Sequence, residues 1–157
     1  MPSLAPTPVP TLTAVAIATP GAVQANKPLS LQTVAYNESA VRAFYVNVDL
    51  SLVSVARVGS DSIICTFSLF NRTTGDKIRV TFDDKSYVLS STGTKYKPLS
   101  FEQATETVPG ERKTIKAMFG VQETGVTANV VMSGYVSAGL ADRAGDVLWQ
   151  PVAVTLP

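Results

Sequence analysis

The sequence predicts an all-β fold, an antiparallel β-sandwich, and three observations support this prediction. In several segments apolar residues occur at every second position, as in strands that bury one face. Turn-forming residues separate these segments at intervals of roughly 8–12 residues. No long segment carries the apolar stripe of an amphipathic helix. About nine short strands are therefore expected, with a closed barrel as the alternative architecture.

The N-terminal segment has the composition of a tether. Four prolines fall among serine, alanine and threonine, namely Pro2, Pro6, Pro8 and Pro10. Such a composition favours an extended chain over a folded edge. We expect residues 1–27 to form this tether, with at most one short strand from Leu12 to Ile17, and residues 28–157 to form the sandwich domain. The favoured interpretation is that a signal peptide or membrane anchor was removed and Met1 added. The alternative is a disordered N-terminus of a cytosolic protein.

The first strands of the domain alternate with increasing clarity. A weak strand is expected from Leu29 to Tyr36. One apolar face then contains Phe44, Val46, Val48, Leu50 and Leu52. After this run the phase changes, because Val53 and Val55 take over the apolar positions. A change of phase within one strand predicts a β-bulge or a bend between sheets.

The most apolar segment follows a turn at Gly59. Its core face is expected to contain Ile63, Cys65, Phe67 and Leu69. Cys65 is predicted to be a buried hydrophobic residue and not a reactive thiol, since free cysteine is among the most buried residue types. A polar turn from Asn71 to Asp76 leads to a half-exposed strand. The apolar face of that strand consists of Ile78, Val80 and Phe82.

The middle of the domain contains a hairpin and a strand. The pattern from Tyr87 to Tyr96 predicts a hairpin with an exposed edge, turning at residues 90–93. The segment from Leu99 to Val108 is less regular and is compatible with one short helical turn. A strand with an apolar face follows the turn at Pro109, and that face contains Ile115, Ala117 and Phe119.

The C-terminal part contains an apolar stripe from Val126 to Val136 and a last strand from Val147 to Leu156. Between them, a loop is expected from Ser137 to Asp146. The last strand carries the single tryptophan and is interrupted by Pro151. Because proline cannot donate to a strand ladder, this strand should lie at an edge or be bulged at that point.

The order of several segments resembles a known family. A hydrophobic strand ending at Asn71 is followed by the strand Lys77–Phe82, the Tyr87–Tyr96 hairpin, and Val108–Glu111 before the strand ending Met118-Phe119. This order resembles the telokin-like, immunoglobulin-like domain of unknown function found in bacterial surface lipoproteins and secreted antigens.

The likeness covers roughly residues 44–157, and the tail after Val136 is longer than in that family. The resemblance implies an immunoglobulin-like sandwich held outside the membrane on a lipid or helical anchor. It also implies an interaction module without shared chemistry, so no active residue is transferred to this chain.

Composition and charge exclude several classes of function. Thirteen lysine and arginine residues against twelve aspartate and glutamate residues leave a net charge of +1, too little to attract nucleic acid or an anionic membrane. The chain has no histidine and a single cysteine, which excludes Ser-His-Asp, Cys-His and histidine–metal sites and an intrachain disulfide. No run approaches the roughly 18 apolar residues of a membrane span. The charged fraction is 16%, against roughly 25% in typical soluble proteins, as is common in exported β proteins.

Carboxylates and aromatic residues are the remaining site candidates. Asp83 and Asp84 are adjacent in a turn, and Asp142 and Asp146 share a loop that lacks the spacing of a calcium site. These four are weak metal candidates. An aromatic platform for a sugar would use Trp149, Tyr96 and Tyr87, with Tyr36, Tyr45 and Tyr135 as further members. Asn37 and Asn71 each begin an Asn-x-Ser/Thr glycosylation pattern. We expect no catalytic residue and no cofactor.

Three functions remain open. The leading hypothesis is a non-enzymatic binding module, extracytoplasmic on a cell surface or secreted, whose partner is a protein or another cell-envelope component. The second is a structural subunit of a surface filament, in which an N-terminal strand (12–17 or 29–36) inserts into a neighbouring copy. The third is a carbohydrate-binding module.

Overall fold

The computed structural model describes residues 26–35, 47–102, 106–138, 143–149 and 151–157. All regular structure in these residues is β-strand. The strands are β1 (Lys27–Leu29), β2 (Leu31–Ala35), β3 (Val48–Val58), β4 (Ser62–Asn71), β5 (Ile78–Phe82), β6 (Tyr87–Ser90), β7 (Lys95–Tyr96), β8 (Pro98–Phe101), β9 (Arg112–Phe119), β10 (Thr127–Val131), β11 (Ser133–Ala138), β12 (Arg143–Trp149) and β13 (Val152–Thr155). Within the described ranges no helix has the length and hydropathy of a membrane span. Residues 1–25 of the predicted tether, with its run 12–17, lie outside the described residues, as do Phe44 and Val46. Lys27, the last residue assigned to the tether, begins β1.

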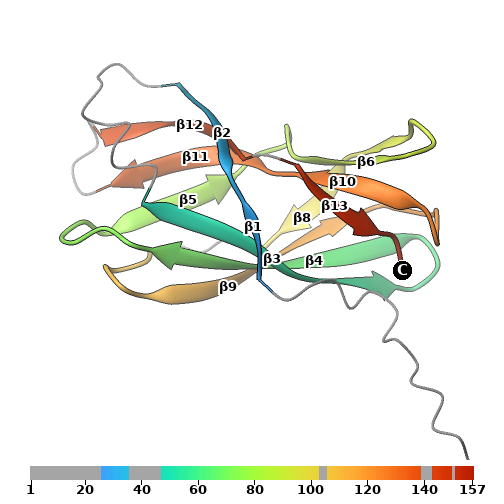
Figure 1. The fold of residues 1–157 in the computed structure, drawn as a ribbon, viewed down its shortest axis with the longest axis horizontal. Helices are drawn as coiled ribbons and strands as arrows, with labels where there is room; N and C mark the ends of the chain where they lie inside the picture. The colour runs from blue at the N-terminus through green and yellow to red at the C-terminus, as the bar shows by residue number, and fades with distance from the viewer. Residues whose placement is uncertain (1–25, 36–46, 103–105, 139–142, 150) are drawn as a thin grey trace, which may run out of the picture.

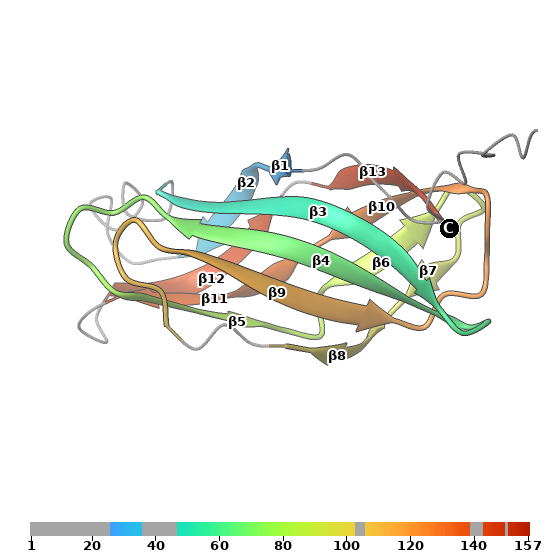
Figure 2. The same ribbon diagram turned by 90° about the horizontal axis from the view of Figure 1, so that it is seen from below.

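The strands form two layers (Figure 1, Figure 2). The first layer is a five-stranded sheet in the order β1-β3-β4-β9-β8. The second layer consists of two four-stranded sheets, β13-β10-β6-β7 and β2-β12-β11-β5, which lie end to end. The strand pairs within the sheets are antiparallel. The all-β, immunoglobulin-like antiparallel sandwich predicted from the sequence is confirmed.

The chain passes from one sheet to another at several short connections, and three of them involve residues 27–35 or the C-terminal strands. In the second layer, β10 continues into β11 through the buried Met132, and β12 is followed by β13 beyond Pro151. The backbone N–H of Trp149 donates to the Met132 carbonyl at 3.0 Å, and this hydrogen bond holds the two connections together. At the third connection, Ser30 separates β1 in the first layer from β2 in the second. Residues 27–35 therefore border both layers.

Two predicted strands are split by these connections. The expected strand from Leu29 to Tyr36 forms parts of β1 and β2, which belong to different layers. The expected final strand breaks at Pro151, because proline has no N–H to donate. Its first half, β12, is an internal strand, and only β13 lies at an edge.

The bulge predicted in the longest strand is confirmed. The pairing of β3 with β4 shifts between Leu52 and Ser54, and Val53 lies at the shift. Leu52 is buried before the shift and Val55 after it, so the bulge keeps apolar residues on the core face although their spacing changes.

The core lies between the layers. It contains the predicted faces of β4, β5 and β9, namely Ile63, Cys65, Phe67, Leu69, Ile78, Val80, Phe82, Ile115, Ala117 and Phe119. Trp149 is the largest fully buried side chain, and its ring centroid lies 5.7 Å from that of Phe82. Gly134 allows β11 to approach β5 closely, since a Cβ there would lie 2.6 Å from the Thr81 carbonyl oxygen.

Two sequence predictions, a loop length and the number of strands, differ from the structure, and a third falls partly outside the described residues. The predicted loop from Ser137 to Asp146 is too long, because β11 extends to Ala138 and β12 begins at Arg143. The segment from Leu99 to Val108 contributes to β8 and to a bridge with β5, and its described residues 99–102 and 106–108 contain no helix. The predicted number of strands, about nine, is lower than the number in the described residues, because changes of sheet divide single apolar runs into two strands.

Candidate interaction surface

Asp83 and Asp84 lie in the turn between β5 and β6. The Asp83 carboxylate accepts hydrogen bonds from the Lys85 N–H at 3.0 Å and from the Ser133 hydroxyl at 3.2 Å. Asp84 is exposed to solvent. The Asp83 carboxylate thus attaches the β5–β6 turn to the start of β11.

The other acidic candidates were expected in the loop before the last strand. Asp146 lies within β12, exposed and opposite Tyr135 of β11. Asp142 lies outside the described residues. In the part of the chain that the structure describes, no group of three acidic or cysteine side chains is close enough to hold a metal ion.

Trp149 lies in the core, with 1% of its surface exposed. Its ring packs against Phe82, and among the described residues its indole Nε1 has no hydrogen-bond partner. Stacking on a sugar requires an exposed aromatic face. Trp149 therefore contributes to packing and offers no surface to a ligand.

Tyr87 and Tyr96 lie on opposite faces of the hairpin formed by β6 and β7. Tyr96 is opposite the buried Val88 in register, so it points toward the core side. Tyr87 is on the outer side, where the Lys95 ammonium lies 4.0 Å from its ring centroid. The two rings therefore do not share one platform. The other tyrosines are an exposed Tyr135 and, outside the described residues, Tyr36 and Tyr45.

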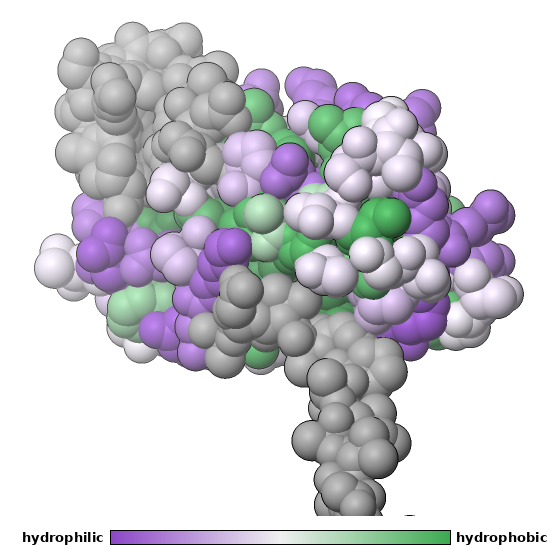
Figure 3. Space-filling model, turned by 45° about the vertical axis from the view of Figure 1, so that its right-hand side comes forward, coloured by the Kyte–Doolittle hydropathy of each residue, from purple (hydrophilic) through white to green (hydrophobic). Residues whose placement is uncertain are grey.

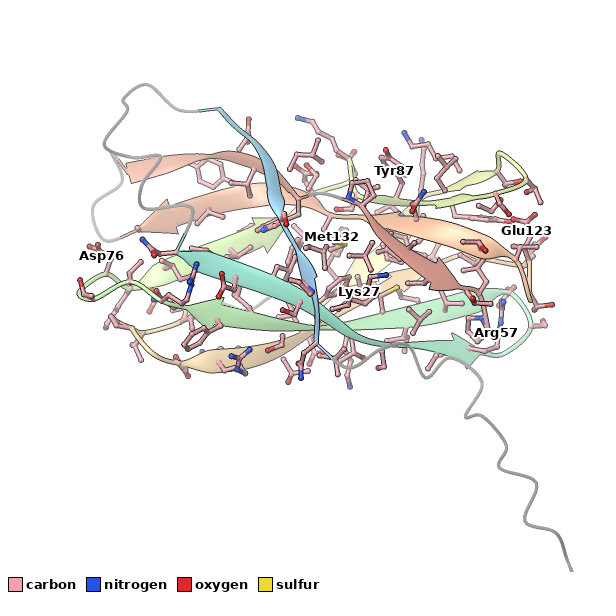
Figure 4. All side chains as sticks on the ribbon, in the orientation of Figure 1. Lys27, Arg57, Asp76, Tyr87, Glu123 and Met132 are labelled. Atoms are coloured by element: carbon pink, nitrogen blue, oxygen red, sulfur yellow. The ribbon has the colours of Figure 1, made fainter. Side chains whose placement is uncertain are left out.

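A network of hydroxyl groups surrounds Glu123 at one end of the sandwich (Figure 4). Glu123 lies between β9 and β10, and its carboxylate accepts hydrogen bonds from the Thr92 hydroxyl and, at 2.7 Å, from the Tyr96 hydroxyl. The Thr92 hydroxyl is also 2.6 Å from that of Ser90. The carboxylate thus joins the β6–β7 hairpin to the loop between β9 and β10. Its partners are 27 and 31 residues away in the sequence, and no local pattern marks them.

The network moves the pKa of both ionisable members. Hydrogen bonds from Thr92, Ser90 and Tyr96 lower the pKa of Glu123. Burial, the hydrogen bond to Glu123 and the negative charge of Glu123 raise the pKa of Tyr96. Near neutral pH the carboxylate stays ionised and the phenol stays neutral. This suits a structural link, whereas a general base needs a pKa near the working pH.

Arg57 lies at the same end of the sandwich and binds backbone carbonyl groups (Figure 4). Its Nε and Nη2 donate to the Pro157 carbonyl at 2.9 and 2.7 Å, and the guanidinium also donates to the carbonyls of Val121 and Glu123. Figure 3, which brings this end forward, shows hydrophilic residues on both sides of the view and hydrophobic residues between them. One half-buried side chain thus links β3, the loop after β9 and the last residue.

Asn71 at the end of β4 is fully buried, and its amide organises the polar turn predicted from the sequence. The Nδ2 group donates to the carbonyls of Asp76 and Thr107 at 2.8 and 2.9 Å. The Oδ1 atom accepts from the N–H and the hydroxyl of Thr73 at 2.9 and 2.6 Å. In the folded chain this asparagine is inaccessible to glycosylation. Asn37 lies outside the described residues.

On the side away from the second layer, no other described strand lies over β3, β4 and β9 (Figure 2). The side chains that point to this side of the three strands form a surface. They alternate with the buried apolar positions of the same strands, and one of them, Ser68, is itself buried. The strand register aligns them in four rows: Ala56, Ile64 and Met118; Ser54, Thr66 and Lys116; Ser51, Ser68 and Thr114; Asp49, Phe70 and Arg112. We call this set the outer face.

The outer face combines few charges with partly buried apolar side chains. Ile64, Phe70 and Met118 are each half-buried, and small hydroxyl residues occupy most of the positions between them. The charged members of the set are Asp49, Lys116 and Arg112. Sequence alternation assigns these residues to the solvent side. Only the register shows which of them are neighbours.

The charged row of the outer face is already ordered within the chain. The Arg112 guanidinium lies 4.5 Å from the Phe70 ring centroid and donates to the Ser68 hydroxyl at 2.9 Å. The Asp49 carboxylate pairs with Arg72 at 2.9 Å. These contacts fix the direction of two opposite charges on either side of one aromatic ring.

Comparisons with known proteins assign no family to the chain. No protein-family model matches the sequence, and no curated protein matches it. The resemblance to the telokin-like domain therefore stays an expectation.

Proposed function

We propose that this chain is a non-enzymatic interaction module, held outside the cytoplasm, that binds a protein through the outer face. The observation that carries the proposal is the composition of that face: half-buried Ile64, Phe70 and Met118 among small hydroxyl residues, with few charges. Relative to the rest of a protein surface, interfaces are depleted in lysine, acidic residues, serine and alanine and enriched in aromatic residues, methionine and arginine. Phe70, Met118 and Arg112 of the outer face belong to the enriched types.

The structure of the sheet edges favours binding at the outer face over binding by strand addition at an edge. The edge strand β8 begins with Pro98, which has no N–H to donate. Its pairing with β9 shifts at Leu99, so few backbone groups are aligned for another strand. The β7 edge is two residues long and carries Lys95. On β5, the Ile78 N–H and carbonyl are already bound to Thr107. These devices discourage strand addition at three edges.

The extracytoplasmic location is supported by the sequence. The charged fraction is low, and the segment before the domain is rich in proline. A full-length gene product that lacks an upstream signal peptide, lipid-attachment cysteine or membrane helix would contradict this location.

Replacement of Thr66, in the middle of the outer face, tests the binding surface. Thr66→Arg places an unpaired charge between Ile64 and Phe70 without touching the core. Thr81→Arg is the matched control, because Thr81 is exposed on β5 in the other layer. Purified wild type and both variants are immobilised and exposed to cell-envelope and secreted proteins of the source organism. We expect proteins retained by wild type and Thr81→Arg to be lost with Thr66→Arg. Equal retention by all three would reject the outer face.

A second candidate function is a filament subunit that exchanges its N-terminal strands. The observation that favours it is that residues 27–35 supply an edge strand to each layer, so the same segment from another copy could take both places. Electron microscopy and size-exclusion chromatography, with and without residues 1–40, test it. Circular dichroism must first show that the shortened chain folds. A monomer before and after the deletion would reject the filament.

A further inference from the structure

We propose that the partner of the outer face is a second copy of this chain, packed face to face about a two-fold axis that runs along β4. This inference rests on the proposed binding function of the outer face and names its occupant. It follows from the strand register, in which β4 is central and β3 and β9 flank it.

A two-fold axis along β4 keeps each row of the outer face opposite the same row of the second copy. Within a row, it places the β3 residue of one copy opposite the β9 residue of the other. The β4 residues meet their own counterparts, so Ile64 faces Ile64 and Phe70 faces Phe70. An isologous contact of this kind must be self-complementary in charge and in size. The outer face meets both requirements.

The charged row is complementary under this operation. Asp49 and Arg112 stand on opposite sides of Phe70. The two-fold axis brings Asp49 of each copy opposite Arg112 of the other, so the dimer contains the same ion pair twice. Asp49 keeps its contact with Arg72, because a carboxylate has two oxygens and can accept from two guanidinium groups. The side chains of Asp49 and Arg72 are 42% and 50% exposed and are accessible to a second molecule.

The sizes of the facing residues also match. Ala56 lies opposite Met118 of the second copy, so a small side chain meets a long flexible one. In the next row the small Ser54 lies opposite the long Lys116. Like charges do not meet in any row. Packed sheets cross at about 30°, so each β4 is inclined to the axis by about half that angle. The inclination offsets the end rows by about 5 Å, a distance that arginine and methionine side chains span.

Charge reversal on either side of the axis tests the dimer. Asp49→Arg gives a face with two arginines in the charged row, and Arg112→Asp gives a face with two aspartates. Each variant alone would pair like charges across the axis. An equimolar mixture of the two would pair opposite charges at both contacts, and only an intermolecular contact can be restored by mixing. The measurement is sedimentation velocity over the micromolar to sub-millimolar range, with circular dichroism to confirm folding.

We expect wild type and the Thr81→Arg control to sediment as dimers, each reversal variant as a monomer, and the mixture as a dimer. A monomeric wild type, a dimeric single variant or a mixture that stays monomeric would overturn the proposal. If one reversal variant does not fold, Thr66→Arg replaces it. This variant is expected to be monomeric, because the two-fold axis places the two introduced arginines opposite each other. A monomeric wild type whose protein binding is lost in Thr66→Arg would reject the second copy and leave the proposed function intact. Retention of all binding by Thr66→Arg would reject the proposed function as well.

Discussion

The guanidinium of Arg57 donates two hydrogen bonds to the carbonyl oxygen of Pro157, a residue 100 positions later in the chain. The same group donates to the carbonyls of Val121 and Glu123. One side chain thereby satisfies backbone acceptors from two segments that would otherwise need water. Arg57 is thus one polar link between the first layer and the C-terminal end of the second, and Lys27 of β1, whose Nζ donates to the Ala153 carbonyl, is another.

Arg57→Met should destabilise the fold by about 2 kcal/mol, because hydrogen bonds from a charged donor to partly buried carbonyls are lost while the aliphatic volume is kept. Urea denaturation followed by circular dichroism measures the effect. The control is Lys77→Met, an exposed position before β5. Equal stability of both variants would show that the Arg57 contacts are dispensable.

Gly134→Ala should destabilise the protein by about 1–3 kcal/mol, because the added methyl group collides with the backbone of β5. Its Cβ would lie 2.6 Å from the Thr81 carbonyl oxygen and 3.2 Å from the Phe82 Cα. Gly120→Ala is the matched control, since its Cβ would lie 3.6 Å from the nearest atom, in the flexible Leu99 side chain. Thermal unfolding of both variants checks the prediction. A Gly134→Ala variant as stable as the control would contradict the close approach of β5 and β11.

Asn71→Ala should cost about 1–3 kcal/mol, because it leaves the carbonyls of Asp76 and Thr107 and the Thr73 N–H without their side-chain partner. Asn71→Asp should be at least as damaging, since a carboxylate has no donor for the two carbonyl oxygens. The control is Asn129→Ala on the exposed side of β10. Chemical denaturation of the three variants measures the difference, and a neutral Asn71→Ala would refute the role of the amide in this turn.

Cys65 should resist thiol reagents in the native state, because burial raises its pKa from 9.0 to about 12. In the unfolded chain the thiol ionises above pH 9, while in the folded chain it stays protonated. Its contribution to stability is therefore fully present below pH 9 and is lost, at about 1.4 kcal/mol per pH unit, as the pH rises toward 12.

Cys65→Ala provides the comparison. The stability difference between wild type and Cys65→Ala should shift in favour of the variant as the pH rises above 9. Denaturation curves at several pH values measure this shift. Rapid labelling of Cys65 by a thiol reagent at pH 8 without denaturant would contradict its burial.

Glu123→Gln should lower the pKa of Tyr96 toward its ordinary value, because the charge and the hydrogen bond of the carboxylate contribute to raising it. NMR titration of the Tyr96 ring resonances measures this pKa. The variant should also be less sensitive to acid. The lowered pKa of Glu123 gives stability that is present above its unfolded pKa and is lost as the pH falls through the folded value. An unchanged Tyr96 titration would mean that the two side chains are not in contact in solution.

Local patterns in the sequence were sufficient for the fold class and for the buried faces of several strands, but not for the points where the chain changes sheets. The alternation in β4, β5 and β9 identifies their buried faces, and the phase change at Val53 identifies the bulge. No pattern marks Ser30 or Met132 as points where the chain changes sheets, because a run of alternating residues reads the same on either side of such a point.

The candidate site residues also divide into those that the sequence alone could place and those that it could not. The sequence by itself determined that Cys65 is buried and that histidine chemistry is excluded, since composition and period-two alternation are local properties. Only the tertiary structure decided that Trp149 fills the core, that Tyr87 and Tyr96 face opposite ways, and that Arg57 reaches Pro157. It also decided that Asp49 and Arg112 flank one ring. These relationships depend on strand register and sheet order, which long-range pairing sets.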